Sequence, residues 1–379
     1  MQSLTTSARA ILGCSALQVS AGLELLNSNL SIRADISGDL EAGSVSRSLF
    51  ADIHSTCSLR LTRRLVWGVD LVKPYVVLTD AMTGASVRFD VGVFCLTTPV
   101  EVIGASLPTF DVSGFDRLLL LRRQVGATYT IAAGVTYRQA LLDVFAAAGL
   151  SGALIEGAAA DDLLPAVKTY PLVADRAADP DQTDTPVTYL RIVNDLLRAI
   201  NFRSVFCDEQ GRFRAVAYVE PSARAVEFVF NADDVLAGIV GEDRQISEDI
   251  WDVPNRWVFR QTNRPAGALA ATEGDGIYTV VNNTDGPTSI AGRGLTWTSV
   301  IDFEAASQAK LVDLGTRRVA LDRALTTRFE VTVGPFPPLG HADVYRYTDA
   351  VAGIDRKVQL ISATLDLLGA DTTMIWEAV

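Results

Sequence analysis

The sequence STCSLRLTRRL at residues 55–65 carries the strongest fold signal in the chain, because apolar side chains recur at every second position (Cys57, Leu59, Leu61). A period of two is the pattern of a β-strand with one face buried and the other solvated. This segment therefore predicts a half-buried strand, and the rest of the N-terminal region can be interpreted around it.

A second alternating segment lies downstream, at residues 86–96. One face of it would carry Val87, Phe89, Val91, Val93 and Cys95. The turn-forming segment DAMTG at residues 80–84 separates it from the apolar run 75–78, which is typical of a β-hairpin. Strands joined by tight turns predict an antiparallel barrel or sandwich over residues 19–112.

Helical patterns begin in the middle of the chain. Residues 136–148 predict a helix that Thr136 caps at its first turn. A second helix is expected to begin at Thr185-Pro186, because proline is tolerated at the first helical position. With a hairpin over residues 203–219, these elements predict a compact α+β unit at residues 113–222.

The last part of the chain mixes strands with one long helix. Strands are expected at residues 226–230, 257–260, 278–281 and 329–333, and the pattern alternates again over 357–368. The helix is expected over residues 303–325. The overall pattern predicts an α+β protein that is mainly β.

Composition sets limits on function. The chain has 379 residues, which suggests two to four domains, and 49% of them are hydrophobic. Its 45 acidic residues outnumber its 33 basic ones, giving a net charge of −12. Broad binding to a nucleic-acid backbone needs clustered Lys and Arg, so this composition disfavours it. We expect no secretory leader and no membrane segment.

Residues suited to catalysis are sparse. The chain has two histidines, His54 and His341, and both are interpreted as surface or turn residues rather than as bases or metal ligands. The four cysteines form no CxxC motif and are expected to be reduced core residues: Cys14, Cys57, Cys95 and Cys207. The segments 274–276 and 292–294 are glycine turns, since neither continues into a phosphate-binding motif.

Acidic residues give weak candidates for a site. Asp175, Asp179, Asp181 and Asp184 could surround a calcium ion, but their spacing misses the EF-hand pattern, so a solvated loop is favoured. The pairs Asp161-Asp162 and Asp233-Asp234 could serve a glycosidase in principle, and nothing singles them out. We predict no catalytic, cofactor-binding or metal-binding residues and no enzymatic activity.

Several segments, taken in their order along the chain, resemble phage tail hub proteins, and in particular minor tail proteins of long-tailed actinobacterial phages. They are residues 39–47 through 57–61, VSGFDRL at 112–118, Thr188-Tyr189-Leu190 with Leu196-Leu197, FCDEQGR at 206–212, and the C-terminal series 303–325, 329–333, 335–339 and 343–345.

This resemblance implies a multidomain subunit with two tail-tube-like β-barrel domains and a smaller α+β domain. Residues 1–112 would form the first barrel and residues 113–222 the smaller domain. Residues 223–379 would form the second barrel, with one long helix and room for a small inserted subdomain.

The same resemblance implies a central hub of the tail tip, or baseplate. The hub would be a homotrimer that adapts a sixfold tube to a threefold tip, and DNA would pass through its lumen without specific binding. Its partners would be the distal tail protein ring, the C-terminus of the tape-measure protein and other tail-tip proteins. It would assemble in the host bacterial cytoplasm and reside at the virion tail tip.

Other functions remain open at this level. The chain could be a distal tail protein or a receptor- or carbohydrate-binding tail protein, and less favourably a cell-wall-degrading tail enzyme. A carbohydrate binder normally presents an aromatic platform, whereas the five tryptophans are scattered in sequence and most are interpreted as core: Trp67, Trp251, Trp257, Trp297 and Trp376.

Overall fold

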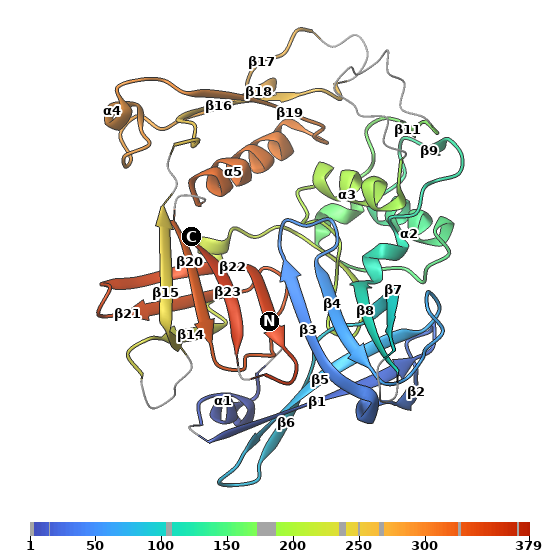
Figure 1. The fold of residues 1–379 in the computed structure, drawn as a ribbon. Coiled ribbons are helices and arrows are strands. Elements are labelled where there is room, and N and C mark those ends of the chain that lie inside the picture. Colours follow the sequence, from blue (N-terminus) through green and yellow to red (C-terminus); the bar gives the residue numbers. More distant parts are fainter. Residues whose placement is uncertain are drawn as a thin grey trace.

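The computed structural model describes residues 4–14, 16–103, 108–172, 187–234, 240–248, 251–264, 269–324, 327–369 and 371–379. Strands outweigh helices and fall into several sheets, which confirms the predicted mainly-β, multidomain α+β class (Figure 1). The helices of the described residues include none that is both long and apolar enough to cross a membrane.

One antiparallel layer of eight strands forms the front of the molecule in Figure 1. In spatial order its strands are β15 (Val240–Glu248), β20 (Thr327–Val333), β23 (Thr372–Ala378), β22 (Ile354–Asp366), β3 (Leu40–Ser48), β4 (Ser55–Leu61), β8 (Thr109–Asp116) and β7 (Phe94–Val102). The alternating pattern at residues 55–61 therefore forms the predicted half-buried strand, β4, with Cys57, Leu59 and Leu61 buried.

A second layer lies behind the first and covers its apolar face. It comprises α1 (Thr6–Leu12), β1 (Leu17–Leu26), β2 (Ile32–Asp35), η1 (Ser37–Asp39), β5 (Leu71–Asp80), β6 (Ser86–Asp90), β14 (Phe228–Asn231) and β21 (Val344–Asp349). A single hydrophobic core lies between the layers, from Leu23 and Leu59 in the N-terminal half to Phe230 and Trp376 in the C-terminal half. The two halves are thus sheets folded over one shared core.

The two halves of the front layer share one topology. In the first half, β3, β4, β8 and β7 are neighbours in that order, and in the second half β15, β20, β23 and β22 are neighbours in the same order. In each half the last two strands along the chain form a hairpin. The earlier strand of that hairpin, β7 in the first half and β22 in the second, takes the last place in the spatial order of its half. The halves join where Leu365 of β22 faces Val45 of β3. A shift of four strands therefore maps one half onto the other.

A middle α+β unit follows β8. Its elements are η2 (Arg117–Leu120), β9 (Tyr129–Ile131), α2 (Tyr137–Ala147), β10 (Leu154–Glu156), η3 (Ala158–Asp161), β11 (Lys168–Tyr170), α3 (Tyr189–Ala199), β12 (Phe206–Cys207), β13 (Phe213–Val216) and η4 (Pro221–Ala223). Thr136 caps α2 by accepting a hydrogen bond from the Gln139 N–H, as the sequence predicted. The helices pack on each other and enclose a separate core.

An inserted unit at residues 251–324 follows β15. It contains β16 (Arg256–Gln261), β17 (Thr272–Glu273), β18 (Gly276–Val281), α4 (Ile290–Arg293), β19 (Thr298–Phe303) and α5 (Gln308–Ala324). Helix α5 packs on the small sheet β17-β18-β16-β19 around Trp257 and Phe259 (Figure 1). The unit connects β15 to β20. The equivalent connection in the first half, between β3 and β4, is the short loop 49–54.

Two expected boundaries were wrong, and a third lies outside the described residues. The alternating segment 86–96 is two strands, β6 and β7, because the chain leaves the sheet between them. Helix α3 begins at Tyr189 with Thr188 as its cap, whereas the expected start at Thr185-Pro186 lies outside the described residues. Helix α5 begins at Gln308, because Phe303 ends a strand of the inserted sheet. The division of the chain into 1–112, 113–222 and 223–379 remains a prediction.

Candidate functional site

The outward face of the eight-stranded layer is a broad polar surface. Inward-facing residues lie in a continuous row of partners across all eight strands, from Val240 in β15 through Leu365 and Val45 to Leu96 in β7. Because successive side chains of a strand point to opposite faces, the neighbouring rows point outward. The outward rows therefore determine what this side of the molecule presents.

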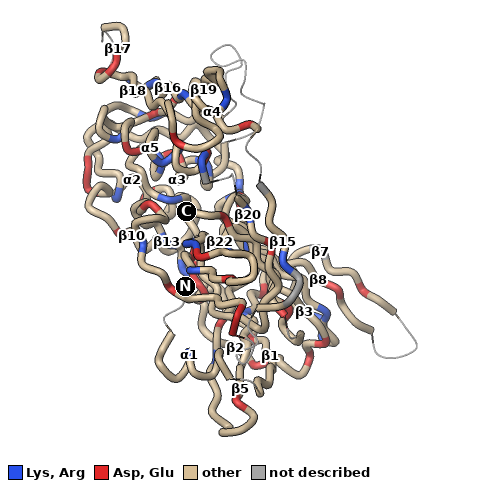
Figure 2. Tube along the Cα trace, turned by 90° about the vertical axis from the view of Figure 1, so that its left-hand side faces the viewer, with Lys and Arg blue, Asp and Glu red and all other residues tan. Residues whose placement is uncertain are grey.

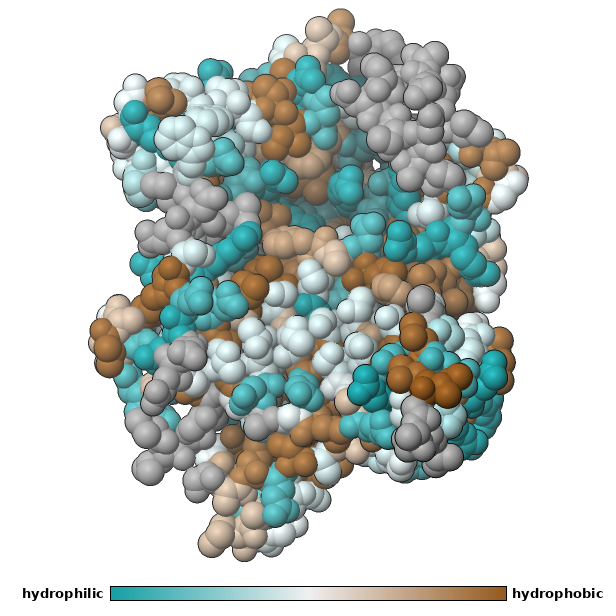
Figure 3. Space-filling model, in the orientation of Figure 1, coloured by the Kyte–Doolittle hydropathy of each residue, from teal (hydrophilic) through white to brown (hydrophobic). Residues whose placement is uncertain are grey.

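Serine and threonine dominate the outward rows. One row runs through Thr332, Thr373, Thr364, Ser46 and Thr56, and another through Ser44, Ser58, Ser113 and Thr97. Ser48 faces Ser362 in a third row. We call these eleven residues the hydroxyl face. None of them is buried, and Figure 3 shows pale residues of intermediate hydropathy over β20, β23, β22, β3 and β4.

Charges on the same face are largely paired. Arg60 Nε donates to Asp111 Oδ1 at 2.7 Å, and these hydrogen bonds lower the pKa of the Asp111 carboxyl. Arg328 Nε lies 3.1 Å from Glu377 Oε1. Unpaired positive charge would attract the phosphates of a nucleic acid, whereas neutral hydroxyls and neutralised arginines do not. The face is suited to passing a polyanion rather than to holding it.

The eight-stranded layer ends in two strand edges. Among the described strands, β15 pairs with β20 alone, and β7 beyond Cys95 pairs with β8 alone. The β7–β8 hairpin projects from the side of the sheet in Figure 2, and its side chains Val100, Val102 and Ile103 are exposed. Unpaired strand edges with apolar side chains are templates for pairing with another chain.

The two histidines meet at the junction of the units, although they are far apart in sequence. His54 lies between β3 and β4, His341 lies between β20 and β21, and their ring centroids are 4.4 Å apart. Phe206 of the middle unit stacks on His341 at 4.5 Å. Burial lowers the pKa of both imidazoles, and nearby positive charge adds to the effect at His341. Of the expected surface or turn position of His54, the surface part was wrong, because the residue is 7% exposed, although it does lie in the loop between β3 and β4.

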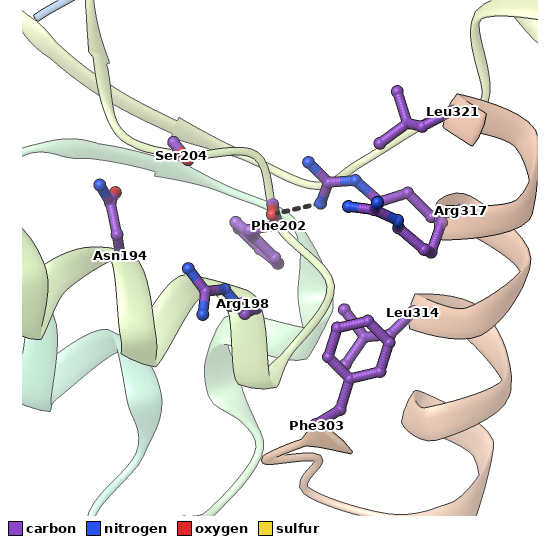
Figure 4. Close-up of a pocket in the computed structure, with 9 residues that line it drawn as sticks. Asn194, Arg198, Phe202, Ser204, Phe303, Leu314, Arg317 and Leu321 are labelled. Carbon is purple, nitrogen blue, oxygen red and sulfur yellow. Dashed lines mark hydrogen bonds between the residues drawn. The ribbon is translucent and has the colours of Figure 1, made fainter. Parts of the chain in front are cut away.

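A cavity of about 220 Å³ adjoins this histidine pair. It lies where the loop 49–54, the middle unit, the loop around His341 and helix α5 meet, and Arg203 and Arg317 line it. A second cavity of about 150 Å³ shares Arg317 and continues between α3 and α5. Figure 4 shows Arg198 from α3 and Arg317 from α5 extending into the space between these helices.

The other residues singled out by sequence analysis have structural roles. Asp161 pairs with Arg138 at 2.6 Å, and Asp233 accepts the Ala350 N–H at 2.9 Å. Asp275 lies in a turn between two glycines with positive φ, as predicted, whereas Arg293 ends the short helix α4, and only Gly294 after it has positive φ. All four cysteines are free, as expected, with Cys57 and Cys95 buried and Cys14 and Cys207 half-buried.

The structure gives no support for a metal site in the part of the chain that it describes, where no three His, Cys, Asp or Glu side chains gather as ligands. The four aspartates between residues 175 and 184 lie outside the described residues.

Two of the five tryptophans come together. Trp251 and Trp297 form an edge-to-face pair with ring centroids 6.1 Å apart, and Trp251 is 73% exposed. Trp297 lines a cleft of about 720 Å³ between the inserted unit and the ends of β15 and β20. Trp257 and Trp376 are fully buried, as interpreted. The tryptophans are therefore less scattered in space than in sequence.

No protein-family model matches this chain, and no curated protein matches its sequence. Solved structures do match it. The tail protein from Neisseria meningitidis MC58 has a TM-score of 0.64 at 12% identity, covering 94% of this chain and 96% of that one. The 43 kDa tail protein of prophage MuSo2 from Shewanella oneidensis has a TM-score of 0.59 at 14% identity, covering 94% and 98%.

A third match is the prophage tail protein gp18 from Listeria monocytogenes EGD-e, with a TM-score of 0.53 at 9% identity and 94% of each chain covered. The chain therefore has the fold of phage tail proteins over nearly its whole length. At the level of the fold, this finding confirms the resemblance to tail hub proteins that the sequence segments indicated.

Proposed function

We propose that this protein is the structural hub of a phage tail tip, and that three copies close into a ring around a channel. The observation that carries the proposal is the repeated four-strand unit of the front layer. Each half contributes strands in the same order, and the two halves pair through β22 and β3. Two equivalent units in one chain are what a threefold ring needs in order to match a sixfold tube.

Strand pairing between subunits would close this ring. The seam between β22 and β3 within one chain is the template, and β7 of one subunit would pair with β15 of the next in the same way. Three layers of eight strands would then form one closed barrel of 24 strands. Closure removes the two unpaired edges, which is the energetic reason for the ring to form.

The hydroxyl face would line the channel. Its neutral hydroxyls, and the paired arginines beside them, support passage of DNA without specific binding. The net charge of −12 adds electrostatic repulsion between the protein and DNA. The ring would contact the distal tail protein ring on one side, other tail-tip proteins on the other and the tape-measure C-terminus inside. We place it at the virion tail tip after assembly in the host cytoplasm, with no enzymatic role.

The first experiment is native mass spectrometry of the purified protein. Three copies of the 40.7 kDa chain give about 122 kDa, the mass expected for the ring. Hydrogen exchange then reports where subunits meet: residues 97–102 of β7 and 244–248 of β15 should be protected in the trimer and not in the dissociated chain. A hexamer would favour a distal tail protein, and a trimer without protection of these edges would exclude strand pairing.

Edge variants test the same proposal. Lysine at Val100 and Val102 places charge on the β7 edge. We expect the variant trimer to dissociate at protein concentrations at least tenfold higher than those at which the parent trimer dissociates. Met82→Lys is the matched control, because Met82 is 83% exposed in the turn between β5 and β6, outside both edge strands. Equal dissociation of the edge variant and the control would argue against closure through β7.

A carbohydrate-binding role is the second candidate, and the Trp251–Trp297 pair favours it. The adjoining cleft also presents Asp252, Asp322 and Arg318, which supply polar partners for sugar hydroxyls. Titration with N-acetylglucosamine and galactose oligomers should give saturable binding that Trp297→Ala abolishes. If neither sugar binds, a role in binding these two classes of carbohydrate is excluded.

A further inference from the structure

Two of the arginines that line the cavities at the junction of the units, Arg203 and Arg317, have no carboxylate within ion-pair distance among the described residues. Within the described residues, Arg203 has no side-chain hydrogen bond or ion pair, and Arg317 donates only to the Phe202 carbonyl at 2.9 Å while its guanidinium lies over the Tyr218 ring. Most other arginines of this acidic chain are paired with a carboxylate, as Arg60 and Arg346 are. Glu227 and Glu220 act on Arg203 and Arg317 only from beyond ion-pair distance, so the cavity holds two guanidiniums without a direct carboxylate partner.

Burial makes this arrangement costly. A guanidinium removed from water loses hydration that only a partner of opposite charge fully replaces. Burial, with Arg224 and Arg317 nearby, lowers the pKa of Arg203 to about 10, so it stays charged at neutral pH. The same burial lowers the pKa of Arg317. The protein thus maintains two charged groups in an environment that disfavours them, and an incoming anion would relieve that cost.

The cavity has room and access for a ligand. Its volume of about 220 Å³ is far larger than the roughly 10–15 Å³ that one water needs. Ser204 and the 56%-exposed Phe50 lie at its rim, so the cavity opens to solvent. Asp52 also lines it, but no ion pair joins Asp52 to either arginine among the described residues. The N–H groups of Arg203 therefore have no hydrogen-bond acceptor among the described residues, and those of Arg317 have only the Phe202 carbonyl.

We propose that this cavity is an oxyanion site, in which Arg203 and Arg317 bind a carboxylate or a phosphate group. Planar guanidiniums match both groups through paired N–H···O hydrogen bonds. Arg198, in the adjoining cavity, extends the positive surface toward α3. The anion would bridge the middle unit, which carries Arg203, and the inserted unit, which carries Arg317 on α5. Binding would hold these two units together.

Inorganic phosphate and glutarate are the probes, compared at equal ionic strength with sodium chloride. The melting temperature should rise in a saturable way with at least one of them. Arg203→Gln should raise the dissociation constant on the order of tenfold or more, because a charged hydrogen-bonding partner is lost. Arg356→Gln is the matched control, since it removes the same charge from an exposed position on β22.

A second variant protects the test against a folding defect in Arg203→Gln. Ser204→Glu places a carboxylate at the rim, and we expect it to raise the melting temperature and abolish the response to added anion. Stronger binding of glutarate would indicate the carboxylate of a protein segment, and stronger binding of phosphate a free phosphate ion. A response that sodium chloride reproduces, or one that persists unchanged in both variants, would overturn the site. The oligomeric mass tests the ring separately.

Discussion

At the scale of single residues, close contacts set narrow limits on substitution. Gly114 lies in β8 directly opposite Cys57, and a Cβ placed on it would lie 2.5 Å from the Cys57 sulfur and 3.1 Å from Leu96. The row of inward residues from Val240 to Leu96 leaves no space for a side chain at this point. The glycine is therefore required for packing rather than for backbone conformation.

Gly114→Ala should lower the free energy of unfolding by about 1–3 kcal/mol, because overpacking forces neighbouring side chains off their rotamers. Gly38→Ala is the control, since a Cβ at Gly38 would meet no atom within 4 Å, and it should change stability by less than about 0.5 kcal/mol. Urea denaturation measures both. Equal stability of the two variants would show that the strands around Gly114 shift enough to accommodate a side chain.

The buried histidines give stability a pH dependence. Burial lowers the pKa of His54 and His341 below the value of about 6.5 that they have in the unfolded chain. The unfolded state then binds more protons than the folded state below about pH 6.5, so stability is lost as the pH falls. Asp116, whose pKa burial raises to about 7, has the opposite sign between about pH 4 and 7.

Comparing variants separates these groups. His341→Gln removes one titrating imidazole, so the stability lost between about pH 7 and pH 5 should be smaller than in the parent protein. Chemical denaturation at the two pH values gives this difference, and each protein is its own reference at pH 7. An unchanged loss would mean that His341 titrates alike in both states.

At the scale of elements, the inserted unit depends on a small core with one buried polar contact. Trp257 is fully buried and its Nε1–H donates to Asp322 of α5 at 2.8 Å. Arg318 pairs with the same carboxylate at 2.9 Å. This contact links β16 to α5, so removing it should loosen the helix rather than unfold the eight-stranded layer.

Trp257→Phe should lower the protection of α5 against hydrogen exchange by about 1–3 kcal/mol, because the buried Asp322 loses a donor. Trp376→Phe is the comparison, since the Trp376 Nε1 has no hydrogen-bond partner in the described structure and its replacement removes volume alone. If α5 exchanges at the same rate in the parent and in Trp257→Phe, the hydrogen bond contributes nothing to its stability.

Elements with a strong local signal could be predicted from the sequence. The alternation at residues 55–61 identified β4, and the turn residues 208–211 identified the β12–β13 hairpin. Boundaries failed where only a single glycine marks the point at which the chain leaves a sheet, as Gly92 does between β6 and β7. The candidate site could not be predicted, because the hydroxyl face, the histidine contact and the Trp251–Trp297 pair all depend on which distant strands and loops become neighbours.

At the scale of the whole molecule, the proposed channel makes the charge of the hydroxyl face decisive for how DNA would pass. Lysine at Ser44, Ser58 and Ser113 would place three positive charges in one row across β3, β4 and β8. We expect this variant to bind double-stranded DNA with an affinity that falls as salt rises, whereas the parent protein should not bind. Gel-shift titration measures this affinity. A variant with three lysines at exposed positions of the β5–β6 turn provides the control.

The seam between β22 and β3 also bears on how assembly depends on concentration. Because both strands belong to one chain, their pairing forms as the subunit folds and is insensitive to dilution. Assembly of six separate units would involve about five losses of translational freedom, whereas assembly of three double units involves only about two. In the proposed ring, fusing the two repeats in one polypeptide would therefore lower the protein concentration needed for assembly, which favours a component that is needed in few copies.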